Sequence, residues 1–416
     1  MGGRCILRMK SCIEICKWYN NADSPVLFMI DDLANVWVDR SGSGEVDLEE
    51  DWGYAKNSEN SSFRFLNEVI LKEYPAVKVT FFTPVGIRVG MIENPAIKSV
   101  SKMINCDEKT KEFFRSVHKN PRFEVAYHGT THGKVGKSNQ DFKQEWELFS
   151  SLEQAMSRVN YGKKIYEEVF EENPRGGKYC GYISNSFSDD SIDKTGFAWW
   201  CRFCNLDTKN AVKKGYFNKF IFGEDSLNVT NFDVKKFGDN DVIDIPSTVN
   251  GELFNSVTYL DTKTIKGMVK KIFRKYLIKG KTKEIGYLLN NNLVISIQEH
   301  ISPMRDDGKR QKPNIFDDRD SLKLIFDYLE DKNVWYCTGS ELAEYIYLKE
   351  NVKVIKVNES RFFFELNITR EISKKEISLI IKDINKSMII TPTGNRILVE
   401  NGSANVPYLL GEYELI

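Results

Sequence analysis

Short apolar runs alternate with amphipathic stretches from residue 24 to residue 348, and this alternation restricts the fold more than any other feature. The apolar runs, rich in β-branched and aromatic residues, lie at 26–30, 78–83, 123–127, 197–201, 241–246, 293–297 and 334–338. Between them, apolar residues recur at helical spacing over 62–74, 108–118, 140–170, 262–279 and 320–331. Such alternation is typical of a mostly parallel sheet covered by helices. It predicts an α/β fold, either a distorted (β/α) barrel or a doubly wound sheet.

The pattern changes near residue 349. From there to residue 416 the sequence consists of strand-like runs separated by turns rich in Asn, Gly, Ser and Lys. A chain of 416 residues is long enough for one large catalytic domain and a smaller module. We therefore expect an N-terminal extension over 1–23, a barrel over 24–348 and a small all-β module over 349–416.

Charge and cysteine usage exclude several classes of protein. Lys+Arg and Asp+Glu both total 59, so no global field draws the chain to nucleic acid. No apolar run is long enough for a transmembrane helix, and charges are scattered through the first twenty residues. The eight cysteines are irregularly spaced, which fits a reducing compartment. The expectation is a cytoplasmic protein without a transmembrane segment and with no nucleic-acid partner.

Polar residues come directly after three of the predicted strands. Asp31 and Asp32 follow the run VLFMI, the stretch HGTTH (128–132) follows 123–127, and His300 lies just past 293–297. An Asp-Asp pair alone means little, because the chain has three others in turn-like settings. In α/β barrels, however, the carboxyl ends of the strands share one face, and that face carries the chemistry.

The residue types predict a catalytic metal on that face. Histidines with three residues between them, His128 and His132, can reach one cation, and Asp32 can complete a three-ligand set with an open position. The preferred divalent metal is zinc, although cobalt or nickel also suits these ligands. Asp31 is then free to accept a proton from water, and His300 can protonate a leaving group. The alternative is that these are unrelated polar residues at the rim of a barrel.

Several motifs resemble those of the polysaccharide deacetylase family, also called the NodB homology domain or carbohydrate esterase 4 group. MIDD (29–32) is similar to the family's first motif, HGTTH to its His-x-x-x-His motif and PRGGKY (174–179) to its third motif. KVTFF (78–82) resembles the structural strand between the first two motifs, and VWYCTGSEL (334–342) resembles the last strand and helix of these barrels. The resemblance covers residues 24–348 and none of the β module.

This resemblance implies a role for each matched residue. Asp31 would be the base, oriented by Arg175, and Asp32 would hold the metal with the two histidines of HGTTH. His300 would be the acid, and the backbone around Tyr179 would help to form the oxyanion site.

Three positions depart from the family pattern. Gly129 stands where Ser or Thr is usual, and Gln298 stands where Leu is usual two places before the acid histidine. The aspartate of the fourth motif, which tunes that histidine, has no clear counterpart, and Asp207 is the candidate.

The resemblance implies a metal-dependent hydrolase that removes an N-acyl group, with acetyl expected, from an amino sugar of a surface glycan or its precursor. One alternative is a hydrolase of another C–N bond on the same barrel, allantoinase-like or imidase-like. The other is a degenerate barrel that binds glycan without catalysis. Trp199 and Trp200 offer flat faces for a sugar ring, but strand alternation lets at most one of them reach substrate, and Trp200 is the predicted one. The basic stretch 266–283 is either a solvated face or a surface for phosphate or membrane.

Overall fold

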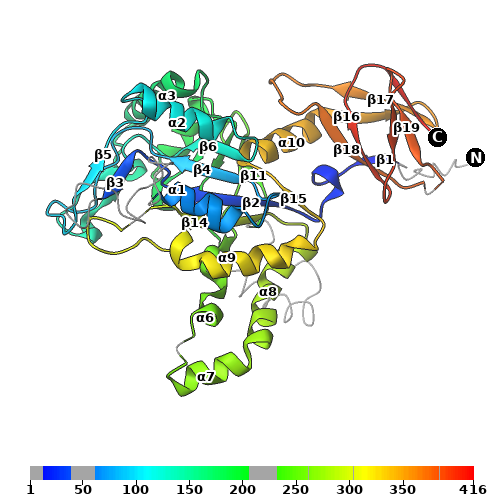
Figure 1. The fold of residues 1–416 in the computed structure, drawn as a ribbon. Coiled ribbons are helices and arrows are strands. Elements are labelled where there is room, and N and C mark those ends of the chain that lie inside the picture. The colour runs from blue at the N-terminus through cyan, green and yellow to red at the C-terminus, as the bar shows by residue number, and fades with distance from the viewer. Residues whose placement is uncertain (1–12, 39–60, 206–231, 261, 303, 384) are drawn as a thin grey trace, which may run out of the picture. The chain divides into compact units, whose positions relative to one another are not determined.

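A computed structural model describes residues 13–38, 61–205, 232–260, 262–302, 304–383 and 385–416 (Figure 1). The chain forms two compact units. One unit comprises Val26–Ser340, and the other combines Met1–Pro25 with Glu341–Ile416. The N-terminal segment groups with the C-terminal residues in one unit.

A ten-stranded, mostly parallel sheet forms the centre of the larger unit (Figure 1). Each predicted apolar run contains one strand: β2 (Ser24–Asp31), β4 (Val79–Thr83), β6 (Phe123–Tyr127), β10 (Trp199–Cys201), β12 (Val242–Asp244), β14 (Ile295–His300) and β15 (Val334–Tyr336). The other strands are β9 (Gly176–Lys178), β11 (Lys235–Phe237) and β13 (Val249–Asn250). The order is β11-β12-β10-β9-β6-β4-β2-β14-β13, with β15 beside β2, and β11 pairs antiparallel with β12. The sheet is curled into a half-barrel, which confirms the predicted α/β class and the distorted barrel.

Strand β9 has no apolar residue, and its glycines are explained by the neighbouring strand. Trp199 and Trp200 of β10 pair with Gly176 and Gly177. A Cβ atom on either glycine would collide with the indole ring of its partner. The two tryptophans therefore require glycines at these positions. The glycines allow β9 to pair closely with β10, and Lys178 follows them at the end of β9.

Helices connect the strands, as predicted. They are α1 (Ser62–Phe65) with its π-helical continuation η2 (Leu66–Leu71), α2 (Glu108–His118), α3 (Leu152–Phe170), α4 (Ser188–Lys194), α6 (Asn255–Thr258), α7 (Ile265–Ile272), α8 (Arg274–Asn290) and α9 (Ile315–Glu330). The helix predicted over 140–170 begins only at Leu152, where the Ser151 side chain accepts a hydrogen bond from the Gln154 N–H. Before it the chain forms β8 (Lys143–Gln144) and the 3₁₀ turns η3 (Asn139–Asp141) and η4 (Glu145–Glu147). In the described residues, no helix combines the length and apolarity that crossing a membrane would require.

The strand register brings the polar strand ends to one level. His300 on β14 lies opposite Asp31 on β2, and Asp31 lies opposite Phe82 on β4. Tyr127, the residue before His128, pairs with Gly177, the residue before Lys178. Because these pairings are parallel, the side chains that follow them gather at the carboxyl edge of the sheet.

The smaller unit is antiparallel, as predicted for residues 349–416. A five-stranded sheet has the order β16-β17-β22-β19-β20, and a three-stranded sheet has the order β1-β18-β21. The strands are β1 (Ile13–Ile15), β16 (Val352–Lys356), β17 (Arg361–Leu366), β18 (Glu376–Ile381), β19 (Met388–Ile390), β20 (Arg396–Leu398), β21 (Ser403–Pro407) and β22 (Glu412–Leu415). Helix α10 (Gly339–Asn351) precedes β16. Residues 13–15, expected to belong to a separate extension, instead supply the edge strand beside β18.

Candidate active site

The carboxylate of Asp31 lies at the end of β2 and is 3% exposed. The Lys178 ammonium contacts both of its oxygens, at 2.8 and 2.7 Å. The amide of Gln298 donates to Oδ2 at 3.1 Å. Nε2 of His300 lies 3.7 Å and Nε2 of His128 lies 3.9 Å from the same oxygen. Side chains from β9, from β14 and from the residue after β6 therefore converge on the buried carboxylate of Asp31.

The cation that contacts Asp31 is Lys178, whereas the motif match had pointed to Arg175. Arg175 precedes β9, whereas Lys178 is the last residue of that strand and lies at the edge where Asp31 ends β2. Lys178 is fully buried, and its ammonium also donates to Oε1 of Gln298 and lies 4.2 Å from the centre of the Tyr182 ring. Arg175 and Lys178 lie at opposite ends of β9. Only the end with Lys178 lies at the edge of the sheet that carries Asp31.

Asp32 has a different environment, although it is the next residue. Arg88 donates to its two oxygens at 3.1 and 3.2 Å, and Nε2 of His132 lies 3.4 Å from Oδ1. Burial disfavours the charged carboxylate, but Arg88 and the nearby histidines outweigh burial and hold the pKa of Asp32 well below its usual range. The backbone of Asp32 has φ +71°, a region that residues other than glycine seldom occupy and that is enriched at functional sites.

The HGTTH loop is fixed by a buried carboxylate from a later turn. Glu145 accepts hydrogen bonds from the backbone N–H groups of Thr130, Thr131 and His132, at 2.7 to 3.0 Å. A Cβ atom at Gly129 would lie 2.7 Å from this carboxylate, which explains the glycine at that position. His132 also has a positive φ, +69°. Glu145 therefore fixes the conformation of the loop that carries the two histidines.

Two of the histidines are oriented by backbone carbonyls. Nδ1 of His128 lies 3.0 Å from the Lys178 carbonyl oxygen, and Nδ1 of His300 lies 2.8 Å from that of Pro313. Each contact favours a proton on Nδ1 and leaves the Nε2 lone pair directed towards the aspartates. Burial lowers the pKa of both imidazoles, so the neutral form is favoured. A neutral imidazole with a free nitrogen suits a metal ligand or a proton carrier.

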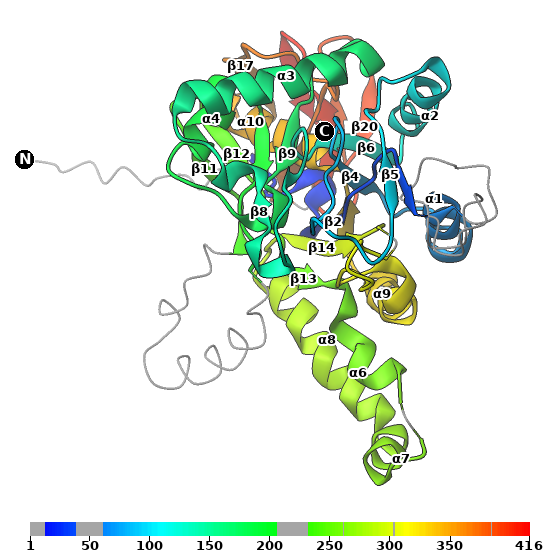
Figure 2. The same cartoon turned by 90° about the vertical axis from the view of Figure 1, so that its left-hand side faces the viewer.

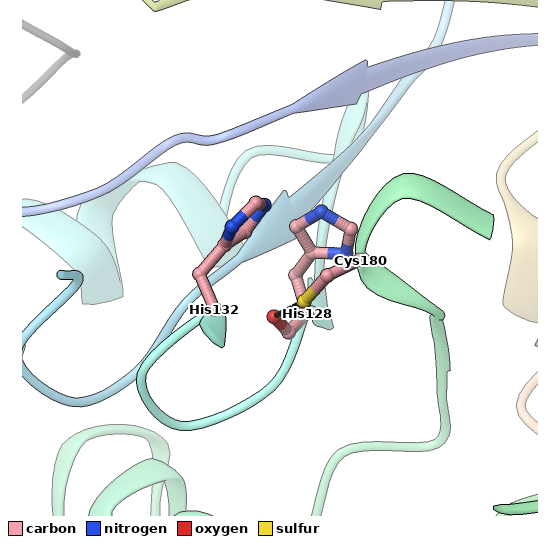
Figure 3. A group of neighbouring side chains, drawn as sticks. All are labelled: His128, His132 and Cys180. Atoms are coloured by element: carbon pink, nitrogen blue, oxygen red, sulfur yellow. Dashed lines mark hydrogen bonds between the residues drawn. The ribbon is translucent and has the colours of Figure 1, made fainter. Parts of the chain in front are cut away.

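The donor set fits a divalent metal ion. His128, His132 and Cys180 place ligand atoms within 4.8 Å of one another, and this group could hold a metal (Figure 3). Nδ1 of His132 is buried and has no hydrogen-bond partner among the described residues, whereas Nε2 faces Asp32. Cys180, the first residue of η5 (Cys180–Tyr182), instead donates its thiol to the His128 carbonyl at 3.1 Å, and burial raises the pKa of that thiol. A bound metal would deprotonate a coordinating thiol, so Cys180 and Asp32 are both candidates for the third ligand beside the two imidazoles.

Trp200, predicted to face a sugar, has no exposed surface. Its indole packs against Tyr127, Trp146 and Phe197. Trp199 is buried as well. The strand sends one indole to each face, and both faces are covered by the core.

The side chain and the backbone N–H of Tyr179 are both engaged in the core of the larger unit. The Tyr179 ring is buried, and its hydroxyl donates to Asp189 at 2.7 Å. Its backbone N–H donates to the Cys201 carbonyl at 3.4 Å, so this N–H is already engaged in the sheet. Asp207 lies outside the described residues.

Sequence reasoning missed Lys178, Gln298 and Arg88 as site residues. Strand alternation was the available signal for Gln298, because residues two apart on β14 face the same side as His300. A strand ending at Lys178 was hidden by its glycines. Arg88 lies in the segment after β4, and nothing in the local pattern distinguishes it from a surface arginine.

Behind His300, the neighbouring side chain of Glu299 points to the other face of β14. It is fully buried against Gly251. Burial, with repulsion from Asp318 and Glu252, raises the pKa of Glu299 well above its ordinary value. Burial likewise raises the pKa of Asp318. Neither carboxyl oxygen of Glu299 accepts a hydrogen bond from a donor among the described residues, so the folded state favours protonated Glu299.

Replacing Glu299 by glutamine should stabilise the protein at alkaline pH. Because the pKa of Glu299 is raised on folding, its stability contribution is complete below the ordinary glutamate pKa and falls as pH rises towards the raised value. A carboxyl whose pKa rises by one pH unit on folding costs about 1.4 kcal/mol of stability once the pH exceeds both pKa values, and glutamine avoids this cost. Urea unfolding across a pH series measures this, and the same pH dependence in the variant and the parent would contradict the assignment.

Comparison with known proteins gives similarity at the level of solved structures. No family model matches the chain, and no curated protein matches it. A Mycobacterium smegmatis protein described as a polysaccharide deacetylase aligns over 80% of this chain and 93% of its own, with 14% identity and a TM-score of 0.44. An allantoinase aligns over 78% of this chain and 91% of its own, with 12% identity and a TM-score of 0.42. A 4-alpha-glucanotransferase from Thermococcus litoralis aligns over 77% and 40%, with 13% identity and a TM-score of 0.40.

Proposed function

We propose that this chain is a metal-dependent hydrolase that removes an N-acyl group, in the first instance acetyl, from an amino sugar of a glycan or its precursor. The observation that carries the proposal is the inequivalence of the two adjacent aspartates. Asp31 is held by Lys178 and Gln298 and faces His300, while Asp32 faces His132 on the metal-binding loop. A metal-dependent amide hydrolase needs both a proton acceptor and a separate metal ligand, and the different surroundings of Asp31 and Asp32 support this division of roles.

The chain's own residues divide the remaining work. Asp32, His128 and His132 would hold the metal, which when bound supplies Lewis acidity towards water and the substrate carbonyl. Asp31 accepts the proton from the attacking water, with Lys178 and Gln298 fixing the direction of its carboxylate. The contact between Nδ1 of His300 and the Pro313 carbonyl leaves Nε2 free, 3.7 Å from Oδ2 of Asp31, so Nε2 takes up the proton that Asp31 received from water and passes it to the departing nitrogen. The products are a carboxylic acid and a free amine.

Incubation with N-acetylated amino sugars tests this assignment. The protein is loaded in turn with zinc, cobalt or nickel and incubated with a panel of N-acetylglucosamine oligomers and nucleotide-linked N-acetyl sugars. It should release acetate and a free amine in equal amounts from at least one of these substrates. Chelation should stop the release, and returning the metal should restore it. Opening of a cyclic amide without acetate release would favour the allantoinase-like reaction, and glycan binding without either would indicate a non-catalytic barrel.

A further inference from the structure

Helix α7 and the first half of α8 expose an unusual concentration of apolar side chains. Of the eighteen large apolar side chains that are exposed in the described part of the chain, seven lie within thirteen consecutive residues. These residues, called the apolar face below, are Ile265, Met268, Val269, Ile272, Phe273, Tyr276 and Leu277. Ile265, Ile272 and Tyr276 are 78%, 76% and 77% exposed. Monomeric soluble proteins seldom leave such a contiguous patch in water unless it binds something.

The spacing of the apolar face is that of amphipathic helices. In α7 the exposed apolar residues fall at i, i+3, i+4 and i+7. Phe273, which lies between the two helices, is followed by Tyr276 and Leu277 of α8 at i+3 and i+4. Gly267 is the only buried residue of α7. In Figures 1 and 2 this part of the chain extends away from the sheet of its own unit. The apolar side chains of an amphipathic helix ordinarily pack onto a core, but those of the apolar face are exposed.

Positive charge surrounds the apolar face without any compensating acid. Residues 265–283 contain eight Lys and Arg residues and no Asp or Glu, in a chain whose formal net charge is zero. Lys270 and Arg274 donate to backbone carbonyls of α6, at 3.0 and 3.2 Å, which ties this segment to the body of the unit. The segment is thus a strongly cationic, apolar protrusion.

We propose that α7 and the first half of α8 form a membrane-surface anchor that binds anionic phospholipid bilayers. The apolar face would enter the boundary between headgroups and acyl chains, and the lysines around it would contact headgroup phosphates. Long lysine side chains can reach the phosphates while their methylene groups stay beside the apolar residues. This binding does not depend on the proposed deacetylation.

Other occupants fit less well. A two-fold dimer through this face would bring two copies of the same cationic patch together, with no acid in either segment to offset the repulsion. Nucleic acid would use the lysines and stack on Phe273 and Tyr276. It offers nothing to the aliphatic side chains of Ile265, Met268 and Ile272. An anionic bilayer matches both the charge and the aliphatic character.

Vesicle sedimentation with the full chain tests the anchor. The protein should bind vesicles of phosphatidylcholine mixed with phosphatidylglycerol and partition at least about tenfold less onto phosphatidylcholine alone. Ile272→Glu should reduce binding to the mixed vesicles by about tenfold or more, since a charge would have to enter the boundary. Raising NaCl to about 0.5 M should weaken binding by screening the lysines.

The matched control is Leu410→Glu, which puts the same charge at an apolar residue that is 81% exposed in the other unit. It should bind vesicles as the parent does, and thermal unfolding should show both variants folded. The proposal is overturned if the parent ignores anionic vesicles or if Ile272→Glu binds them equally well. It is also overturned if the lipid-free chain is a dimer that Ile272→Glu converts to a monomer, or if the segment binds nucleic acid and not lipid.

Discussion

An Asp31→Asn protein should keep its metal and lose turnover by about 10²- to 10⁴-fold, the usual contribution of a positioned general base. Asparagine matches aspartate in shape and can still accept from Lys178 through its carbonyl oxygen. It cannot accept a proton from water. Metal content after dialysis and the rate of acetate release, measured on the same preparation, separate the two effects.

The control for Asp31→Asn is the same substitution at Asp190. This residue also belongs to an Asp-Asp pair, but it lies exposed on α4. Asp190→Asn should leave turnover unchanged. Thermal unfolding should be measured together with turnover, because removing one partner of a buried ion pair such as Asp31–Lys178 can cost about 3–5 kcal/mol of folding stability. Unchanged turnover in folded Asp31→Asn would remove Asp31 from the mechanism.

Alternation along the chain was enough to predict most of the central sheet. Every apolar run became a strand, because a strand covered on both faces must be apolar throughout and helices must fill the intervals. The parallel pairing then brought Asp31, His128 and His300 to one edge, as the positions of these residues at strand ends had indicated.

The errors arose where one strand determines the composition of another. β9 can be predicted only when its pairing with β10 is known, because the indoles of Trp199 and Trp200 require the glycines beside them. A motif match alone pointed to Arg175 and passed over Lys178. The pairing of Ile13–Ile15 with β18 joins segments more than 360 residues apart, and no local pattern contains that information. The basic stretch 266–283 was interpreted as a solvated face or as a surface for phosphate or membrane, and the sequence alone does not reveal that seven large apolar side chains in 265–277 are exposed.

Removing Asp32 should have the opposite effect to removing Asp31. Asp32→Asn should weaken metal affinity by at least about 100-fold, because changes outside the ligand set of a metal site already cost 10- to 100-fold. Asparagine is preferable to alanine here. Arg88 is buried against both oxygens of Asp32, and alanine would leave its guanidinium without this partner. Competition with a chromophoric chelator measures the affinity.

Cys180→Ser completes the test, since Cys180 is the rival third ligand beside His128 and His132. If Asp32 is the ligand, Cys180→Ser should bind metal within about twofold of the parent, because its thiol already donates to the His128 carbonyl and a hydroxyl can do the same. Metal retained in Asp32→Asn but lost in Cys180→Ser would reassign the third ligand to sulfur. Asp32 would then act as the counter-charge of Arg88, and the two adjacent aspartates would both be carboxylates held by buried cations.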